Sequence, residues 1–266
     1  MTDDAPRYVA IGDSIARGFL PTWPRPKPRD RCDFRLAGVP LRWFDNSSIA
    51  YPVAVARMIS DQVGSRIALD MKCTCSGMRT DHLWRHDSPT ELLRSGFDQP
   101  TALVTVTVGA NDLMPMWFRY LAAATILRPV KPLLPSAVMR SIRERLAPER
   151  RQMLAAARGV QDRLDHILGW IAAQSPSATI IVTSYYSGDD SLFPSVGFSD
   201  RLFEAIGAAV GGCPSASLVD VTPVLARAES QRTLTSRFDG LHPTADGQRR
   251  IARAVADEAV RLMASH

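Results

Sequence analysis

Tyr8-Val9-Ala10-Ile11-Gly12-Asp13-Ser14 is an apolar run that ends in a polar turn. We interpret Tyr8–Ile11 as a buried β-strand and Gly12–Ser14 as the turn at its carboxyl end. Ligands of α/β sheets bind at that edge, and a helix N-terminus behind the turn stabilises negative charge, so the position suits Ser14 as a nucleophile. Taken alone the pattern is weak. It better fits an ordinary strand–turn–helix junction in which Asp13 or Ser14 caps the helix.

Two further polar turns supply the partners that such a serine needs. Near the C-terminus, Asp239-Gly240-Leu241-His242-Pro243 places an aspartate three residues before a histidine, so that the carboxylate can orient the imidazole. A serine nucleophile needs a base of this kind, and the base needs an orienting partner. In the middle of the chain, Val106-Thr107-Val108-Gly109-Ala110-Asn111-Asp112 repeats the pattern of strand and polar turn. The side-chain amide of Asn111 can donate to an oxyanion there.

These stretches, in this order, resemble a known set of motifs. Gly12-Asp13-Ser14, Gly109-Ala110-Asn111-Asp112 and Asp239-Gly240-Leu241-His242-Pro243 are similar to signature blocks of the GDSL-type, or SGNH, hydrolases. Cys75-Ser76-Gly77-Met78-Arg79-Thr80 resembles the remaining block, most closely that of the actinobacterial secreted-esterase branch. The four blocks spread over nearly the whole chain, and four in the right order are far more specific than any one.

The resemblance implies a serine-dependent carboxylic ester hydrolase, an esterase or lipase of lipid metabolism. It implies an acyl-enzyme on Ser14 and a catalytic triad of Ser14, Asp239 and His242. It also implies an oxyanion hole made by the backbone N–H groups of Ser14 and Gly77 and by the side-chain amide of Asn111.

Other polar residues of these blocks are given supporting roles. We expect Asp13 to shape the nucleophile turn and Asp112 to support the asparagine loop. Cys73-Thr74-Cys75 lies near His82 and His86, but this spacing fits no common structural zinc pattern, and the two histidines are better explained as a surface pair on a helix. We therefore expect no metal and no cofactor.

Several segments are expected to line the substrate pocket. The segment Leu20–Asp45 leaves the turn of Ser14 and is rich in proline, which excludes regular helix and central strand. We expect a pocket wall there or, as an alternative, a flexible surface insertion. The apolar segment Leu113–Leu134 follows Asn111 and lines an acyl pocket, forms a core helix, or does both. The substrate-binding candidates are Trp23, Met114, Trp117 and Tyr185.

The cysteines give conflicting indications of the compartment. The chain has four, and no signal peptide is visible at its N-terminus, which favours reduced thiols and a cytoplasmic protein. The resemblance instead implies a disulfide between Cys32 and Cys75, as in a secreted esterase, which requires that the N-terminus be processed or trimmed. Cys73 competes with Cys75 as the partner. Cys213 is expected to stay free.

Strand and helix patterns alternate along the chain, which predicts parallel pairing with right-handed crossovers. The expected strands are Tyr8–Ile11, Arg66–Met71, Thr101–Val108, Thr179–Ser184 and Ala216–Val221. The expected helices are Asn46–Gln62, Thr80–Ser95, Ser136–Gln174, Phe198–Val210 and Thr244–Met263. Ser47 or Ser48 is expected to cap the first of them, and Pro148 and Gly159 are expected to divide Ser136–Gln174. This predicts a three-layer α/β/α sandwich with a flavodoxin-like five-stranded parallel sheet, the SGNH hydrolase fold.

Length and composition limit the remaining possibilities. With 266 residues, of which 45% are hydrophobic and 22% charged, we expect a single domain over residues 1–266. The net charge of +5 comes from scattered arginines, which argues against nucleic-acid binding. The longest apolar run is too short to span a bilayer, so we expect no stable membrane insertion. We expect a monomer that acts on a small-molecule ester or lipid.

Alternatives from other functional classes remain open. An acyltransferase would use the same acyl-enzyme with an alcohol in place of water. A catalytically silent ligand-binding domain could share the fold, although the presence of all four blocks argues against silence. The α/β-hydrolase pattern G-x-S-x-G fails because Ala16 occupies its last position, and the phosphate-binding glycine patterns of nucleotide-binding folds are absent.

Overall fold

The computed structural model describes residues 5–19, 34–36, 39–116, 135–146, 150–185, 198–225 and 242–264. Its centre is a five-stranded parallel sheet in the order β4-β1-β7-β8-β9. The strands are β1 (Arg7–Gly12), β4 (Ala68–Thr74), β7 (Leu103–Thr107), β8 (Thr179–Thr183) and β9 (Ala216–Val219). The chain order reverses beside β1, which is the point where ligand sites form in open α/β sheets.

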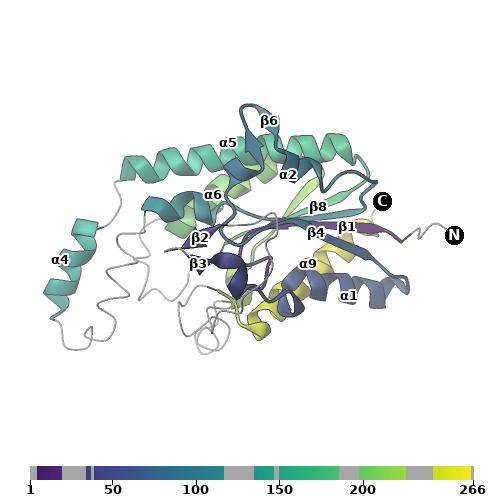
Figure 1. The fold of residues 1–266 in the computed structure, drawn as a ribbon, viewed down its shortest axis with the longest axis horizontal. Helices are drawn as coiled ribbons and strands as arrows, with labels where there is room; N and C mark the ends of the chain where they lie inside the picture. The colour runs from purple at the N-terminus through teal and green to yellow at the C-terminus, as the bar shows by residue number, and fades with distance from the viewer. Residues whose placement is uncertain are drawn as a thin grey trace.

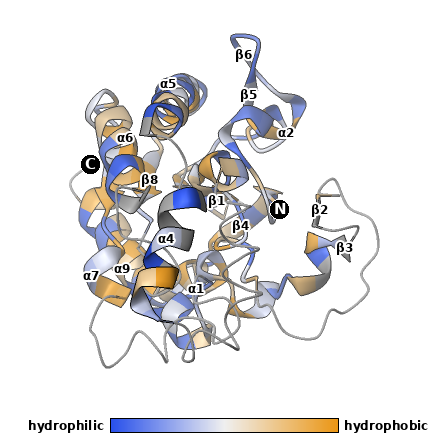
Figure 2. Ribbon diagram, turned by 90° about the vertical axis from the view of Figure 1, so that its left-hand side faces the viewer, coloured by the Kyte–Doolittle hydropathy of each residue, from blue (hydrophilic) through white to orange (hydrophobic). Residues whose placement is uncertain are grey.

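Helices cover both faces of this sheet. α1 (Tyr51–Val63) and α9 (Ala245–Met263) lie on one side, and α5 (Arg150–Gln174) and α6 (Phe198–Gly211) lie on the other (Figure 1). These helices mix hydrophilic and hydrophobic residues, as expected for elements with one face on the sheet and one in solvent (Figure 2). The predicted three-layer α/β/α sandwich is therefore confirmed.

The shorter elements fill the connections. They are β2 (Arg35–Leu36), β3 (Val39–Pro40), η1 (Leu41–Phe44), η2 (Ser47–Ile49), η3 (Thr80–His82), β5 (Trp84–Arg85), β6 (Ser88–Pro89), α2 (Glu91–Arg94), α4 (Ser136–Leu146) and α7 (Thr222–Leu225). Residues 110–116 are also helical. Among the helices that the structure describes, none combines the length and apolar character needed to cross a membrane.

The predicted helix over Thr80–Ser95 is wrong. The segment contains η3, the β5–β6 hairpin and the short helix α2. His86 and Asp87 have φ values of 51° and 56°, a left-handed conformation suited to a tight hairpin turn and incompatible with a helix. His82 and His86 therefore do not share a helical face, and His82 instead accepts a hydrogen bond at Nδ1 from the backbone N–H of Arg79.

Two helix boundaries also differ from the prediction. Ser47 and Ser48 lie in η2, and α1 begins at Tyr51 with no side-chain cap. Gly159 does not divide the long helical segment, because α5 continues through it from Arg150 to Gln174. α4 ends at Leu146 and α5 begins at Arg150, and Pro148, the other predicted break, lies outside the described residues.

The side chain of Gln248 replaces the missing cap of α1. It is fully buried on α9, and its Oε1 accepts a 2.9 Å hydrogen bond from the backbone N–H of Tyr51. Its Nε2 donates at 3.0 Å to the carbonyl of Ile15, in the turn that follows β1. A single amide therefore satisfies two buried backbone groups and ties the last helix to both the first helix and the nucleophile turn.

We predict that Gln248→Leu lowers the unfolding free energy by roughly 1–3 kcal/mol, because it leaves the buried N–H of Tyr51 without its partner and leaves the carbonyl of Ile15 with only its bond from the N–H of Gly18. Urea titration followed by circular dichroism measures the change. The control is Gln174→Leu at the exposed end of α5, which should stay within about 0.5 kcal/mol of wild type. Equal stabilities for the two variants would contradict the bridging role of Gln248.

Candidate active site

The nucleophile turn is tightly packed against the neighbouring strand. The backbone N–H of Asp13 donates to the carbonyl of Thr107 at 3.0 Å. A Cβ on Gly12 would lie 2.6 Å from Cβ of Ala16 and 2.9 Å from the carbonyl oxygen of Thr107, so no larger residue fits there. Ser14 follows at the carboxyl end of β1 and is half-buried, which leaves its hydroxyl accessible.

His242 faces this serine. Its Nε2 lies 2.8 Å from Oγ of Ser14, although 228 residues separate the two in sequence. The histidine directly precedes α9, whose N-cap Thr244 accepts a hydrogen bond from the backbone N–H of Gly247 at 3.3 Å. The ring of Phe19 packs at a centroid distance of 4.4 Å and helps to fix the imidazole plane. Asp239, the predicted orienting acid, lies outside the described residues.

Asp13 is a buried junction between three segments. Its Oδ1 accepts from the backbone N–H of Ile15 at 3.0 Å, and its Oδ2 accepts from the hydroxyl of Tyr185 and from Nδ2 of Asn111 at 3.2 Å. Burial, with a small contribution from Asp112, raises the pKa of Asp13 from 3.8 to about 6, against the lowering effect of the Tyr185 and Ile15 donors and of nearby His242. The carboxylate shapes the turn, as predicted, and its contacts to Tyr185 and Asn111 were not foreseen from the sequence.

Asn111 is held from two sides. Its Nδ2 donates to Asp13 and, at 3.0 Å, to the backbone carbonyl of Met78. The side-chain amide therefore joins the loop after β7 to the loop after β4. Both loops leave the carboxyl edge of the sheet next to Ser14, where the sequence placed them.

Gly77 has a conformation that requires glycine. Its φ is 86°, in the left-handed region, and a Cβ there would lie 2.8 Å from Cδ1 of Leu41. Within the part of the chain that the structure describes, the backbone N–H groups of Gly77 and Ser14 make no hydrogen bond. Two backbone donors of the predicted oxyanion hole are thus without a protein partner in this region.

Asp112 anchors the asparagine loop from behind. It accepts hydrogen bonds from the backbone N–H of Thr80 at 2.9 Å, from the Thr80 hydroxyl at 2.6 Å and from the Arg163 guanidinium at 3.0 Å. Burial raises the pKa of Asp112, and the contacts with Thr80 and Arg163 oppose that rise. The supporting role predicted for Asp112 thus has a structural basis, and Arg163 is a participant that no sequence motif indicated.

The predicted substrate-binding residues are only partly described. Tyr185 is buried, and its hydroxyl is engaged with Asp13. Met114 lies half-buried in the helical segment 110–116, which also contains Asn111. Trp23 and Trp117 lie outside the described residues.

Cys75, in the loop before Gly77, is disulfide-bonded. Cys73 and Cys213 are free and buried, and the Cys73 thiol donates to the carbonyl of Leu92 at 3.1 Å. Between the two cysteines that the sequence left in competition, the structure therefore selects Cys75. The predicted partner, Cys32, lies outside the described residues, so the pairing remains a prediction.

The fold and the site together define a class of protein. A serine within hydrogen-bond distance of a histidine at the carboxyl edge of the sheet is an arrangement suited to nucleophilic catalysis. The family model of the GDSL-like lipases and acylhydrolases matches residues 10–250, and the chain belongs to this GDSL-like lipase/acylhydrolase family. The chain is accordingly a carboxylic ester hydrolase, which confirms the predicted class. No curated protein sequence matches it.

Solved structures of esterases and lipases share the fold at low sequence identity. The lipase Lip_vut3 from a goat rumen metagenome has a TM-score of 0.57 and 15% identity over 96% of this chain and 97% of that chain. The extracellular lipase of Streptomyces rimosus has a TM-score of 0.54 and 18% identity, covering 95% and 99%. Est24, a carbohydrate acetylesterase from Sinorhizobium meliloti, has a TM-score of 0.55 and 14% identity, covering 97% and 99%. These similarities support the fold; the actinobacterial branch remains a prediction.

The raised pKa of Asp13 predicts a specific pH dependence of stability. Between its unfolded value of 3.8 and about 6, the folded protein binds more protons at Asp13 than the unfolded chain does. The Asp13 contribution to the unfolding free energy therefore falls as pH rises through this window, by on the order of 3 kcal/mol in total. Urea unfolding of wild type and Asp13→Asn at pH 4, 5, 6 and 7 isolates that contribution. Parallel stability curves for the two proteins would contradict it.

Proposed function

We propose that the chain hydrolyses carboxylic esters through an acyl-enzyme formed on Ser14. The observation that carries the proposal is the 2.8 Å contact between Oγ of Ser14 and Nε2 of His242 at the carboxyl edge of the sheet. This distance lies within the range over which a general base takes a proton from a hydroxyl group. The membership in the ester-hydrolase family adds independent support.

In the proposed reaction, Oγ of Ser14 attacks the ester carbonyl carbon while Nε2 of His242 takes the hydroxyl proton. The tetrahedral intermediate collapses, the bond to the leaving alcohol breaks, and His242 returns the proton to that alcohol. A water molecule then attacks the acyl carbon while His242 takes its proton. The bond to Oγ of Ser14 breaks, His242 returns the proton to Oγ, and the free carboxylic acid departs. Asp239 would orient the imidazole and stabilise its charged form.

The oxyanion would be held by the backbone N–H groups of Ser14 and Gly77 and by the amide of Asn111. Neither backbone group has a hydrogen-bond partner in the described part of the chain, so both are available to a negatively charged oxygen. The two amide hydrogens of Asn111 are engaged with Asp13 and Met78. We propose that the longer bond, to Asp13, is the one shared with the oxyanion.

The first prediction of this proposal concerns Ser14. Ser14→Ala should abolish hydrolysis of p-nitrophenyl esters and labelling by a serine-directed phosphonate, because no nucleophile remains. A series of acyl chain lengths on wild type gives the substrate preference in the same experiment. Turnover that survives the substitution, with the variant folded by circular dichroism, would reject the acyl-enzyme.

A second prediction separates transition-state stabilisation from substrate binding. Asn111→Ala should lower kcat by ~10²-fold or more and leave KM within a few-fold, because the amide acts on charge that develops during the reaction. Steady-state kinetics on the best p-nitrophenyl ester measure both constants. A large rise in KM with kcat intact would make Asn111 a substrate-binding residue instead.

A further inference from the structure

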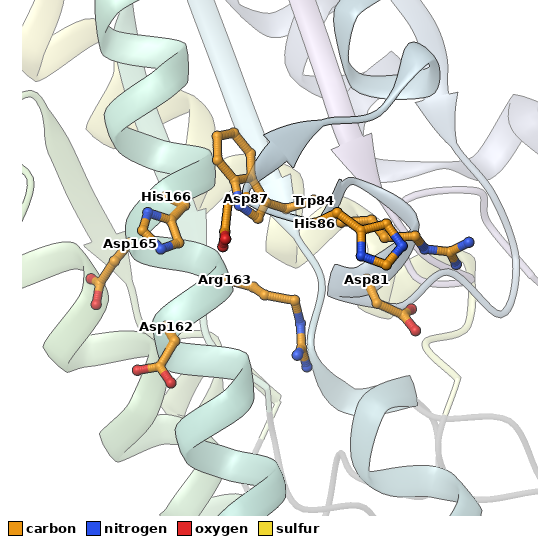
Figure 3. A pocket seen from close by; sticks show the side chains of 9 residues that line it. Asp81, Trp84, His86, Asp87, Asp162, Arg163, Asp165 and His166 are labelled. Carbon is orange, nitrogen blue, oxygen red and sulfur yellow. The ribbon is translucent and has the colours of Figure 1, made fainter.

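Arg163 joins the two loops that carry the proposed oxyanion donors. It extends from α5 into the space between that helix and the segment that carries Asp81 (Figure 3). Its Nε lies 2.5 Å from Oγ1 of Thr80, three residues after Gly77. Its terminal nitrogen lies 3.0 Å from Oδ1 of Asp112, the residue after Asn111.

The two loops already touch each other at this point, and the contact is buried. Thr80 is fully buried, and the side chain of Asp112 is only 5% exposed. The hydroxyl of Thr80 donates to Asp112 and accepts from Arg163, so its hydrogen-bonding capacity on both sides is used. The guanidinium closes a three-membered network in which each side chain contacts the other two.

We propose that Arg163 is a positioning residue for the oxyanion hole, which it holds by fixing the loop of Gly77 against the loop of Asn111. The inference rests on the proposed function, because it gives Arg163 a purpose only if those two loops bind the oxyanion. Arg163 itself touches neither Ser14 nor His242 through any contact in the described structure. Its effect on the reaction is therefore indirect and passes through Thr80 and Asp112.

An arginine suits this role better than other cations. The planar guanidinium presents Nε and a terminal nitrogen in a fixed fork, so it can reach a hydroxyl and a carboxylate at the same time. Displacing an oxyanion donor by even a fraction of an ångström weakens its bond to the transition state, whereas ground-state binding depends on it much less. The expected signature of a loosened network is thus a lower kcat with KM unchanged.

The surroundings of Arg163 leave room for its side chain to reach Thr80 and Asp112. A Cβ on Gly159, one turn earlier in α5, would lie 3.3 Å from both terminal nitrogens of Arg163, so glycine there spares the guanidinium a close contact. On its other side, Arg163 borders an open polar cleft of about 660 Å³ between α5 and the β5–β6 hairpin (Figure 3). The arginine is 31% exposed there. Its substitution is therefore less disruptive to folding than loss of a fully buried charge.

The test compares Arg163→Met with Arg158→Met, an exposed arginine on the same helix, in wild-type and Asn111→Ala backgrounds. Arg163→Met should lower kcat roughly 10-fold with KM unchanged, and Arg158→Met should change neither constant. In the Asn111→Ala background, Arg163→Met should lower kcat by only about 3-fold, because one of the two donors that Arg163 positions is already gone. Melting temperatures are recorded for every variant.

Two results would overturn the inference while leaving the proposed function intact. One is an unchanged kcat in folded Arg163→Met. The other is a full, multiplicative loss in the Asn111→Ala background, which would mark a general structural effect. Failure of the proposed function would give a different result, because the Ser14→Ala and Asn111→Ala variants would then hydrolyse esters at the wild-type rate.

A second pair of variants decides the matter if Arg163→Met does not fold. Gly159→Ala adds a methyl group beside the guanidinium, whereas Gly169→Ala lies on the same helix with no atom within 4 Å of the new Cβ. Both replace a helical glycine and should keep or raise the melting temperature. We expect kcat to fall roughly 3-fold in Gly159→Ala alone. Equal kcat values for the two variants would overturn the inference.

Discussion

The buried carboxylate of Asp13 is the constraint on which the arrangement of the site depends. It accepts hydrogen bonds from the turn after β1, from Asn111 after β7 and from Tyr185 after β8. A carboxylate in an apolar interior is costly unless its oxygens are satisfied, so the three segments must converge on it for the fold to be stable. The rise of its pKa to about 6 measures how incompletely these neutral donors replace water.

The parallel sheet makes that convergence possible. β1 lies between β4 and β7, so the loops that follow these three strands emerge side by side at one edge. Ser14, Gly77 and Asn111 are therefore brought together by topology before any side chain interacts. His242 comes from a different direction, at the start of α9, and Gln248 one turn later fixes that helix to the carbonyl of Ile15. A single buried amide thus couples the position of the base to the turn that carries the nucleophile.

The sequence was sufficient to predict the parts of the fold that follow from local patterning. Short apolar runs, such as Tyr8–Ile11 and the β-branched Thr101–Val108, identified the strands, and their alternation with helices predicted the sheet. The error over Thr80–Ser95 arose because its polar residues were interpreted as one helix, although Pro89 in the middle of the segment argues against a continuous helix. The left-handed turn at His86 and Asp87 that makes the hairpin has no glycine or asparagine in the sequence to indicate it. The unexpected start of α1 has a different cause, since its cap comes from Gln248, 197 residues away.

For the candidate site, too, local patterns in the sequence were informative and long-range contacts were not. Residues within short motifs, such as Ser14, Asn111 and His242, could be proposed from the sequence because their neighbours form a recognisable pattern. The contacts of Tyr185 with Asp13 and of Arg163 with Asp112 were not predicted. Tyr185 lies 172 residues from Asp13 in sequence, and Arg163 lies 51 residues from Asp112, so neither belongs to the motif that contains its carboxylate partner. Long-range side-chain contacts leave no periodic trace in a single sequence, so a motif identifies the groups that react more readily than the groups that hold them.

The two buried aspartates of the site are balanced in different ways, and this bears on what each can do in the proposed reaction. Asp112 faces the full positive charge of Arg163, whereas Asp13 faces neutral donors and the nearby imidazole. As the reaction proceeds, an ionised Asp13 would attract the imidazolium on His242 and repel the oxyanion beside Asn111. These two effects have opposite signs, so they act against each other. The effect of Asp13 on the position of Asn111 has no such opposing effect, because the carboxylate accepts a hydrogen bond from the Asn111 amide and so orients it. Its contribution to the reaction would therefore come from where it holds that amide rather than from its charge.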